Sequence, residues 1–258
     1  MRQRPAQFWI DRSHPFAKGS VFAGLGQTPG TSLYRDDSLY KNHGTLTGYT
    51  GAGNTPADRW KLAIGRSALT SATGDTVVFP AIIPASYPWS LSCWAYPTTG
   101  ARYLVCDPGP SSPPNFVLQI SAAANWEVYL ASASPIVSTA AKVGVWQHVA
   151  LVAQSASSVT FFVNGVSFAC SGAGAAPSIS AVWLFNRAAG SRLWLGMAAD
   201  LIVANRAWSV GDIGLLSSPV RSTDYDGALC WLRGREQVWM GSAAPAANRR
   251  RRFLALGV

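Results

Sequence analysis

The chain has 258 residues, of which 48% are hydrophobic, and it carries a net charge of +9 at pH 7. This is enough apolar material for one large core, but the 24 glycines and 16 prolines interrupt it too often for a helix bundle. No run approaches the roughly 20 apolar residues that cross a bilayer, so we expect no membrane partner. The composition therefore predicts one main domain of the all-β class.

Residues 1–30 are basic at their start and end in a Gly/Pro-rich connection. The run Phe8-Trp9-Ile10 makes this segment too apolar for a solvated tail. We expect an ordered arm without a strand pair, which lies on the main domain or on a neighbouring chain. The segment contains no apolar core of a signal peptide, so we expect a protein that is made and kept soluble in a cytoplasm, unless it leaves by cell lysis or a dedicated export route.

Residues 34–46 include Asp36, Asp37, Ser38 and Asn42, whose side chains favour turns because they bond to nearby backbone groups. Calcium is the alternative reading, but the ion needs six to eight oxygen ligands. This segment alone does not supply that many. We therefore expect a structural turn and no cofactor, with calcium kept open.

The side chains of residues 89–96 are expected to point alternately to two faces, with the two-residue period of a strand. One face consists of Trp89, Leu91, Cys93 and Ala95, and the other of Ser90, Ser92, Trp94 and Tyr96. The first face is expected to lie in the core. The two aromatic residues of the second face either pack against protein or form a platform on which a sugar ring stacks.

A Pro/Gly/Ser loop at residues 107–115 separates two further strand-like runs. It contains a single charge and no aromatic residue, so we expect an exposed, stiff spacer or packing contact rather than a recognition loop.

Residues 144–170 predict an antiparallel meander of three strands. Residues 146–152 and 159–163 both show the two-residue period, and the Asn164-Gly165 dipeptide tolerates the positive φ angles of a tight hairpin turn. We expect Trp146 to pack in the core that this meander closes.

The basic charge is concentrated at the two ends of the chain. Residues 1–20 carry four basic side chains and one acidic one, and residues 233–258 carry six arginines and one glutamate. The residues between them hold 11 basic and 10 acidic side chains. At the C-terminus Arg249–Arg252 precede the apolar run Phe253-Leu254-Ala255-Leu256, which favours docking on an acidic protein surface over binding of nucleic acid.

Several motifs resemble those of laminin-G-like, concanavalin A-like jelly rolls. In chain order they are Asn42-His43-Gly44-Thr45-Leu46, residues 89–97, W-x-H-V-A-L-V at residues 146–152, V-x-F-x-V-N-G at residues 159–165, residues 195–201 and residues 205–209.

The resemblance covers about residues 33–216 and implies a two-sheet antiparallel jelly-roll sandwich. It also implies a short final helix at residues 210–216, which Ser209 can cap, and a half-buried strand position for His148 rather than a catalytic one. We therefore place an N-terminal arm at residues 1–30, the jelly-roll domain at 31–216 and a basic extension at 217–258. Because related domains bind glycans, adhere, hydrolyse glycans or only pack, the resemblance specifies the fold better than the function.

Catalytic and metal chemistry find little support in the sequence. Glycan hydrolysis on this fold needs two paired carboxylates, but the only glutamates are Glu127 and Glu236, and neither belongs to an E-x-D-x-E run. The cysteines and the three histidines lack zinc-site spacing, and we expect reduced thiols. These cysteines are Cys93, Cys106, Cys170 and Cys230. We therefore expect no enzymatic activity, with a pair of aspartates brought together by folding kept as the alternative.

Ser13-His14-Pro15 and Ala17-Lys18-Gly19 resemble the lead-in of laminin-G-like proteins encoded among bacteriophage structural genes. Together with the basic ends, this resemblance implies a virion structural protein, a capsid decoration or tail-associated protein, that binds capsid or other virion proteins or copies of itself. The residues expected to make the attachment are Arg2, Arg4, Phe8, Trp9, Arg249, Arg250, Arg251, Arg252, Phe253 and Leu254. The alternative is a lectin-like adhesion module that recognises cell-surface glycans.

Overall fold

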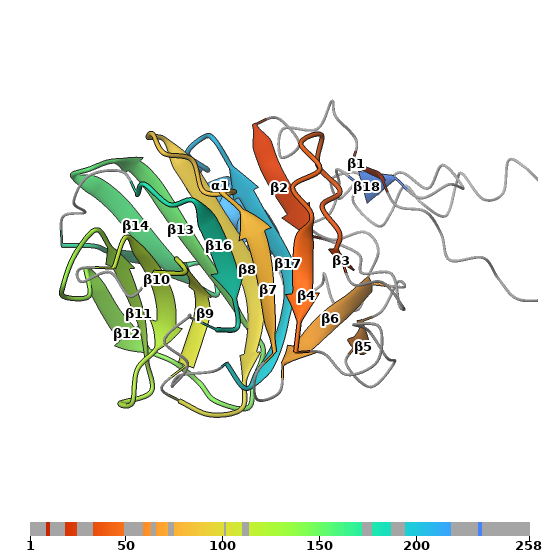
Figure 1. The fold of residues 1–258 in the computed structure, drawn as a ribbon. Helices are drawn as coiled ribbons and strands as arrows, with labels where there is room; N and C mark the ends of the chain where they lie inside the picture. Colours follow the sequence, from red (N-terminus) through yellow and green to blue (C-terminus); the bar gives the residue numbers. More distant parts are fainter. Residues whose placement is uncertain are drawn as a thin grey trace, which may run out of the picture.

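The alternating runs of the sequence form the strands of two antiparallel sheets that pack face to face (Figure 1). The computed structural model describes residues 19–24, 33–48, 75–100, 102–109, 114–171, 177–186 and 194–217, together with the backbone of residues 9–10, 59–62, 66–71 and 232–233. The expected all-β jelly-roll sandwich is confirmed. The described residues include no helix with the length and apolarity needed to span a bilayer.

The first sheet contains the predicted meander and is called the meander sheet. Its last strand, β17, pairs along one edge with β8 and along the other with both β6 and β2. In spatial order the strands are β15 (Val166–Ala169), β14 (Ser158–Val163), β13 (Gln147–Ser155), β8 (Trp89–Pro97), β17 (Gly196–Ala204), β6 (Arg66–Ser71) and β5 (Arg59–Leu62), with β2 (Ser20–Gly24) beside β17.

The second sheet is called the facing sheet, and its strands also pair antiparallel. In spatial order they are β12 (Val137–Ala140), β11 (Asn125–Leu130), β10 (Phe116–Ile120), β9 (Arg102–Cys106), β16 (Ala181–Leu184), β7 (Thr76–Pro80), β4 (Gly44–Thr47) and β3 (Leu33–Tyr34).

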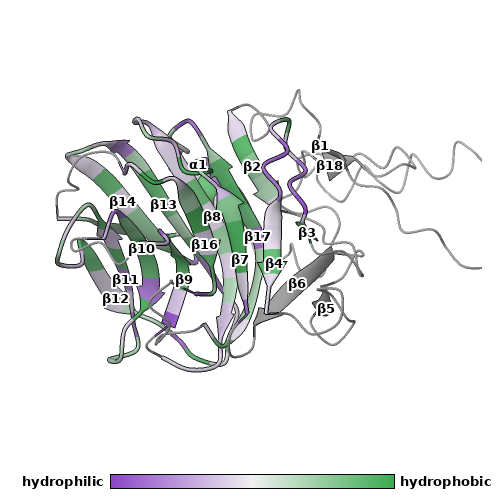
Figure 2. Ribbon diagram, in the orientation of Figure 1, coloured by the Kyte–Doolittle hydropathy of each residue, from purple (hydrophilic) through white to green (hydrophobic). Residues whose placement is uncertain are grey.

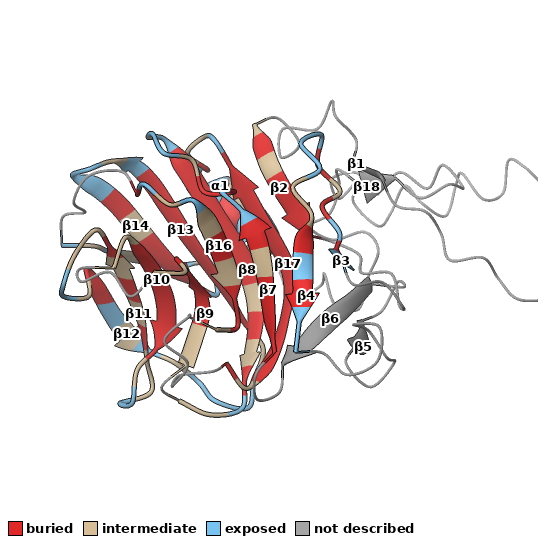
Figure 3. Ribbon diagram, viewed as in Figure 1, coloured by how far each residue is buried: buried red, intermediate tan, exposed pale blue. Residues whose placement is uncertain are grey.

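The main core lies between the two sheets. Trp89, Leu91, Cys93 and Ala95 of β8 are all inaccessible to solvent, as their period predicts. Figures 2 and 3 show hydrophobic and buried residues concentrated on the central strands, while exposed residues gather in loops and on strands such as β12. The core therefore depends on strands from both sheets, many of them far apart in the sequence.

The outer face of the meander sheet, turned away from the main core, is also apolar. Helix α1 (Val210–Ser217) covers one end of it, where Ile213 and Leu216 pack with Ala150 and Val152 in a second hydrophobic cluster. Trp146 does not lie in the main core. It is half-buried on this outer face, beside the half-buried Tyr96. The expectation for Trp146 was wrong because both faces of β13 are covered by protein, so its alternation does not show which face is inward.

The predicted local signals around the meander and the helix are confirmed. Asn164 and Gly165 have φ angles of 50° and 82°, as a tight hairpin turn between β14 and β15 requires. The backbone N–H of Asp212 donates to Ser209 Oγ over 3.1 Å, and the backbone N–H of Ser209 donates to Asp212 Oδ2 over 2.8 Å. This reciprocal pair is a capping box at the start of α1.

The N-terminal arm differs from the expectation in two ways. Strand β2 lies within residues 1–30 but pairs with β17, so this part of the arm belongs to the sandwich. Further upstream, β1 (Trp9–Ile10) pairs antiparallel with β18 (Leu232–Arg233), with Trp9 opposite Arg233. The arm thus contains a strand pair after all, and its partner strand comes from the C-terminal extension.

Candidate functional site

Most residues expected to attach the chain to a partner lie outside the described residues. They are Arg2, Arg4, Phe8, Arg249, Arg250, Arg251, Arg252, Phe253 and Leu254. Of the predicted set, Trp9 alone has a described backbone, in the ladder between β1 and β18. The attachment residues therefore stay a prediction, but the ladder brings the N-terminal and C-terminal segments together.

Asp36 organises the turn in which calcium was the alternative reading. Its Oδ1 accepts hydrogen bonds from the backbone N–H groups of Ala23 (2.9 Å) and Ser38 (2.8 Å). Its Oδ2 accepts from Ser38 Oγ and from the backbone N–H of Asn42, each at 2.7 Å. The buried carboxylate thus ties β2 to the segment between β3 and β4, which supports the structural reading.

Within the described ranges, no group of three or more His, Cys, Asp or Glu side chains is arranged to hold a metal ion. Cys93, Cys106 and Cys170 are reduced thiols, as expected, and Cys230 lies outside the described residues. Burial raises the pKa of the Cys170 thiol to about 11, and burial together with the nearby Asp200 raises the pKa of Cys93 further. Both thiols are therefore protonated and unreactive at neutral pH.

The two candidates for a sugar-stacking platform, Trp94 and Tyr96, lie half-buried on the outer face of the meander sheet beside Met197. The Trp94 ring packs edge-on against His148 at 5.4 Å and 62°, and Tyr96 is tilted against Trp146 at 5.6 Å and 57°. The rings thus pack against one another instead of forming a single flat plane. This arrangement favours the packing role over sugar stacking.

Glu127 lies in β11 on the outer face of the facing sheet. Its Oε2 accepts hydrogen bonds from Gln119 Nε2 at 2.9 Å and from the Tyr129 hydroxyl at 3.1 Å. Its cross-strand neighbours are Gln119 in β10 and Ser138 in β12, neither of which is a carboxylate. Glycoside hydrolysis normally uses two carboxyl groups about 5 to 9.5 Å apart, and the direct cross-strand neighbours of Glu127 do not provide the second one.

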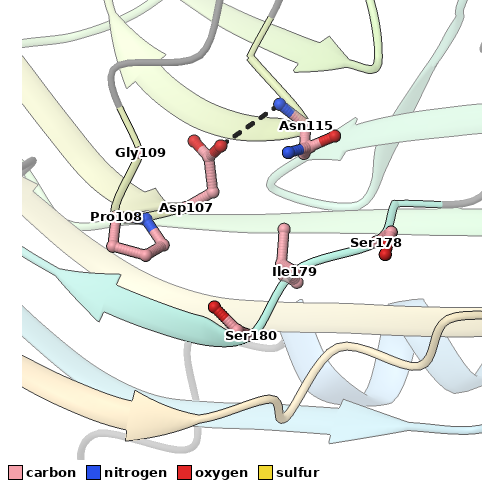
Figure 4. A pocket seen from close by; sticks show the side chains of 7 residues that line it. All are labelled: Asp107, Pro108, Gly109, Asn115, Ser178, Ile179 and Ser180. Carbon is pink, nitrogen blue, oxygen red and sulfur yellow. Dashed lines mark hydrogen bonds between the residues drawn. The ribbon is translucent and has the colours of Figure 1, made fainter.

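A pocket of about 360 Å³ opens at the rim of the facing sheet and is called the rim pocket (Figure 4). It lies where β9 ends, where β10 begins and where the chain enters β16. Its described lining residues are Asp107, Pro108, Gly109, Asn115, Ser178, Ile179 and Ser180. The volume lies at the small end of the range for small-molecule sites.

The described lining of the rim pocket combines the buried Asp107 with neutral polar and apolar groups. Asp107 is 2% exposed, and its Oδ2 accepts a hydrogen bond from the backbone N–H of Asn115 at 3.3 Å. In Figure 4 the Asp107 carboxylate faces Asn115, and Ile179 reaches toward them from the opposite wall. Hydroxyl, amide and carboxylate groups beside the apolar Pro108 and Ile179 suit a small ligand with both hydroxyl groups and an apolar face.

Sequence reasoning missed this pocket. The loop at residues 107–115 was expected to be an exposed spacer, but Asp107 is buried and lines the pocket. The opposite wall, residues 178–180, comes from a segment about 70 residues later in the chain. The one available signal was an aspartate directly after a strand and next to Pro-Gly, which is also common in ordinary turns.

The two packed sheets with a pocket at their rim place the chain in the class of jelly-roll β-sandwiches. Within this class the chain belongs to the concanavalin A-like lectin/glucanases superfamily, whose laminin G family model matches residues 71–214. None of the curated proteins matches the chain.

Several solved structures have a similar fold. A mutant of Trypanosoma rangeli sialidase with trans-sialidase activity has a TM-score of 0.57 at 16% identity, covering 83% of this chain and 36% of that chain. The receptor binding domain of botulinum neurotoxin mosaic serotype C/D has a TM-score of 0.58 at 13% identity, covering 78% and 51%. The binding domain of Paraclostridial Mosquitocidal Protein 1 has a TM-score of 0.55 at 14% identity, covering 78% and 52%.

The chain thus spans between 36% and 52% of the length of these three proteins. At such low sequence identities the similarity shows the fold alone.

Proposed function

We propose that the chain is a non-enzymatic carbohydrate-binding module whose ligand occupies the rim pocket. The observation that carries the proposal is the pocket itself: about 360 Å³, lined by a buried carboxylate, an asparagine and two serines beside Pro108 and Ile179. Sugar rings present the matching groups, with hydroxyl groups around their edge and apolar C–H groups on their faces. A single ring in such a pocket can make both kinds of contact.

Two further observations support a binding role. The superfamily includes lectins, and two of the similar structures are described as binding domains. Although others are sialidases, Glu127 has no carboxylate as a cross-strand neighbour, which favours binding over hydrolysis.

Filling the rim pocket should abolish glycan binding. Ser180 is exposed and lines the pocket, so the indole of Ser180→Trp is expected to occupy the ligand's space and to lower affinity for the best glycan at least about tenfold. The measurement is a glycan array, followed by calorimetry with that glycan. Ser138→Trp, at an exposed position of β12 outside the pocket, is the matched control and should bind as the parent does.

An array on which the parent protein binds no glycan would contradict the proposal. So would Ser180→Trp binding as tightly as Ser138→Trp, because the ligand would then lie elsewhere.

A second candidate function is that of a non-enzymatic bacteriophage virion protein, a capsid decoration or tail-associated protein attached through its basic ends. The observation that favours it is the ladder between β1 and β18, which brings together the two segments that carry the excess positive charge. Clustered positive charge suits an acidic surface on a capsid protein or on another copy of the chain. The two functions are compatible, since a virion protein can also bind glycans.

Replacing Arg249–Arg252 with serine should weaken such an attachment without unfolding the sandwich. The four arginines lie beyond the described strands of both sheets, and loss of their charge should make the protein dissociate from its particle at lower salt. Sedimentation of particles across a salt series measures this, with the denaturation midpoint as a control on folding. Attachment with the same salt dependence as the parent would count against the basic ends.

A further inference from the structure

We infer that two copies of this chain pair through the open edge of β15 and form a two-fold symmetric dimer. The inference does not depend on the proposed carbohydrate site or on the basic ends. In spatial order β15 is the last strand of the meander sheet, and among the described strands only β14 pairs with it. The side of β15 that faces away from β14 is therefore an open edge.

The pairing with β14 shows which backbone groups lie at this edge. The backbone N–H of Cys170 donates to the carbonyl oxygen of Val159 over 3.2 Å, so the N–H and C=O groups of Phe168 also point toward β14. The groups of Ser167 and Ala169 alternate with these and point away from β14. Both residues are exposed, and no described strand lies on that side to bond with them.

The open edge also lacks the charges that keep most edge strands apart. Residues 143–186, which include β15, contain no Asp, Glu, Lys or Arg. By contrast β5, the strand at the opposite end of the meander sheet in Figure 1, carries Arg59 and Lys61. Charged side chains on an edge strand prevent it from pairing with another chain. Their absence from β15 favours pairing and lets two chains of net charge +9 meet without local repulsion.

One antiparallel register uses every open group of the edge. With Ser167 of one copy opposite Ala169 of the other, the pair exchanges two hydrogen bonds, and the two-fold axis repeats them to give four. A shift in one direction would need the N–H of Ser171, which already donates to the Ile136 carbonyl oxygen over 2.7 Å. A shift in the other direction would use Gly165, which lies in the hairpin turn with a φ angle of 82°. The backbone of the edge is therefore complementary to itself.

The side chains are complementary in the same register. Val166, Phe168 and Cys170 share one face of β15, and Phe168 and Cys170 pack against the main core. In the dimer Phe168 lies opposite its own copy at the two-fold axis, and Val166 lies opposite Cys170. Val166 is 61% exposed in the single chain, so pairing removes apolar surface from water. This apolar match to itself favours a second copy over an unrelated chain.

The edge strand of the facing sheet, β12, is also uncharged but makes a poorer contact. Its exposed residues Ser138 and Ala140 correspond to Ser167 and Ala169, so the same kind of pairing would bring Thr139 opposite its own copy. Two threonines bury less apolar surface than two phenylalanines. We therefore assign the contact to β15.

Sedimentation equilibrium of the full chain tests the dimer. The mass is expected to rise from 27.4 kDa toward twice that value as the concentration is raised to about 100 µM. High salt should leave the dimer intact, because no ion pair holds it together. A monomer at every concentration, or a dimer that dissociates in high salt, would overturn the inference.

A proline substitution tests which edge makes the contact. Ser167→Pro removes an N–H that points away from β14, so β15 stays paired with β14 while two of the four intermolecular hydrogen bonds are lost. The dissociation constant should rise at least about tenfold. Ser138→Pro makes the same change on β12 and should leave the dimer as it is. A dimer that Ser167→Pro does not weaken, or that Ser138→Pro weakens equally, would refute the assignment to β15.

A disulfide tests the register without relying on the proline variant. Val166→Cys places a thiol opposite Cys170 of the second copy, where the Cβ atoms of a cross-strand pair are about 4.5 to 5.5 Å apart. Within one strand the two positions lie about 13 Å apart, too far for a disulfide, so the bond must join two chains.

The control for this disulfide is Val210→Cys, which exposes a thiol on α1 at a position that is 69% exposed. With diamide as the oxidant and the protein at micromolar concentration, Val166→Cys should form covalent dimers at least about tenfold faster than Val210→Cys. Adding Cys170→Ser should remove this advantage. Equal rates for the two single variants, or an advantage that survives Cys170→Ser, would contradict the register and with it the inference.

Discussion

Replacing Trp89 with alanine is expected to lower the free energy of unfolding by about 3 to 5 kcal/mol, the range for buried large aromatic residues cut to alanine. Trp89 in β8 is 0% exposed and meets Phe116 of β10 edge to face, with ring centroids 6.0 Å apart. These two residues come from different sheets, so the truncation opens a cavity where the meander sheet and the facing sheet meet. Urea denaturation measures the loss.

Trp146 provides the matched comparison, because the same truncation on the outer face of the meander sheet leaves the main core intact. Trp146 is half-buried beside Tyr96 and Met197. Trp146→Ala should therefore lower the free energy of unfolding by only about 1 to 2 kcal/mol, mainly through lost apolar contact. Equal losses for the two variants would show that this assignment of the faces of the meander sheet is wrong.

Replacing Asp36 with alanine should lower the free energy of unfolding by about 3 to 4 kcal/mol, although among the described residues its carboxylate has only hydrogen-bond partners and no ion-pair partner. Three backbone N–H groups and the Ser38 hydroxyl donate to its two oxygens, and each buried donor left without an acceptor costs about 1 to 3 kcal/mol before water or a neighbour compensates. We expect β2 to detach first, because Ala23 loses its acceptor. Hydrogen exchange at the Ala23 amide, combined with urea denaturation, tests both statements.

Two variants separate the hydrogen bonds of Asp36 from its charge. Asp36→Asn removes the charge but turns an NH₂ group toward donors, so most of the loss should remain. Asp37→Asn removes a neighbouring carboxylate whose ion-pair partner, Arg35, is half exposed. This substitution should lower the free energy of unfolding by no more than about 1 kcal/mol. If Asp36→Ala were as mild as Asp37→Asn, water would have to replace the carboxylate in this turn.

Local features of the fold could be predicted from the sequence alone. The period of two in β8, β13 and β14 reports the alternation of side chains within a strand, and the Asn164-Gly165 turn reports the φ angles of its own residues. The Ser209 cap likewise depends on a residue only three positions away. Such signals are readable because the interacting groups are neighbours in the chain.

Other features were decided only by the tertiary structure, because they depend on groups that are distant in the sequence. The alternation in β13 did not show which face is inward, since the outer face is also apolar: α1 packs on part of it, and aromatic side chains of the neighbouring strand β8 lie beside Trp146. Strand β2 was assigned to the arm because its partner, β17, lies about 180 residues away. The rim pocket needs Asp107 and Ser180 on opposite walls, and neither position is distinctive by itself. The sequence therefore determined the strands of the meander and the fold class, whereas the packing of distant segments determined the strands of the N-terminal arm, the core face and the candidate site.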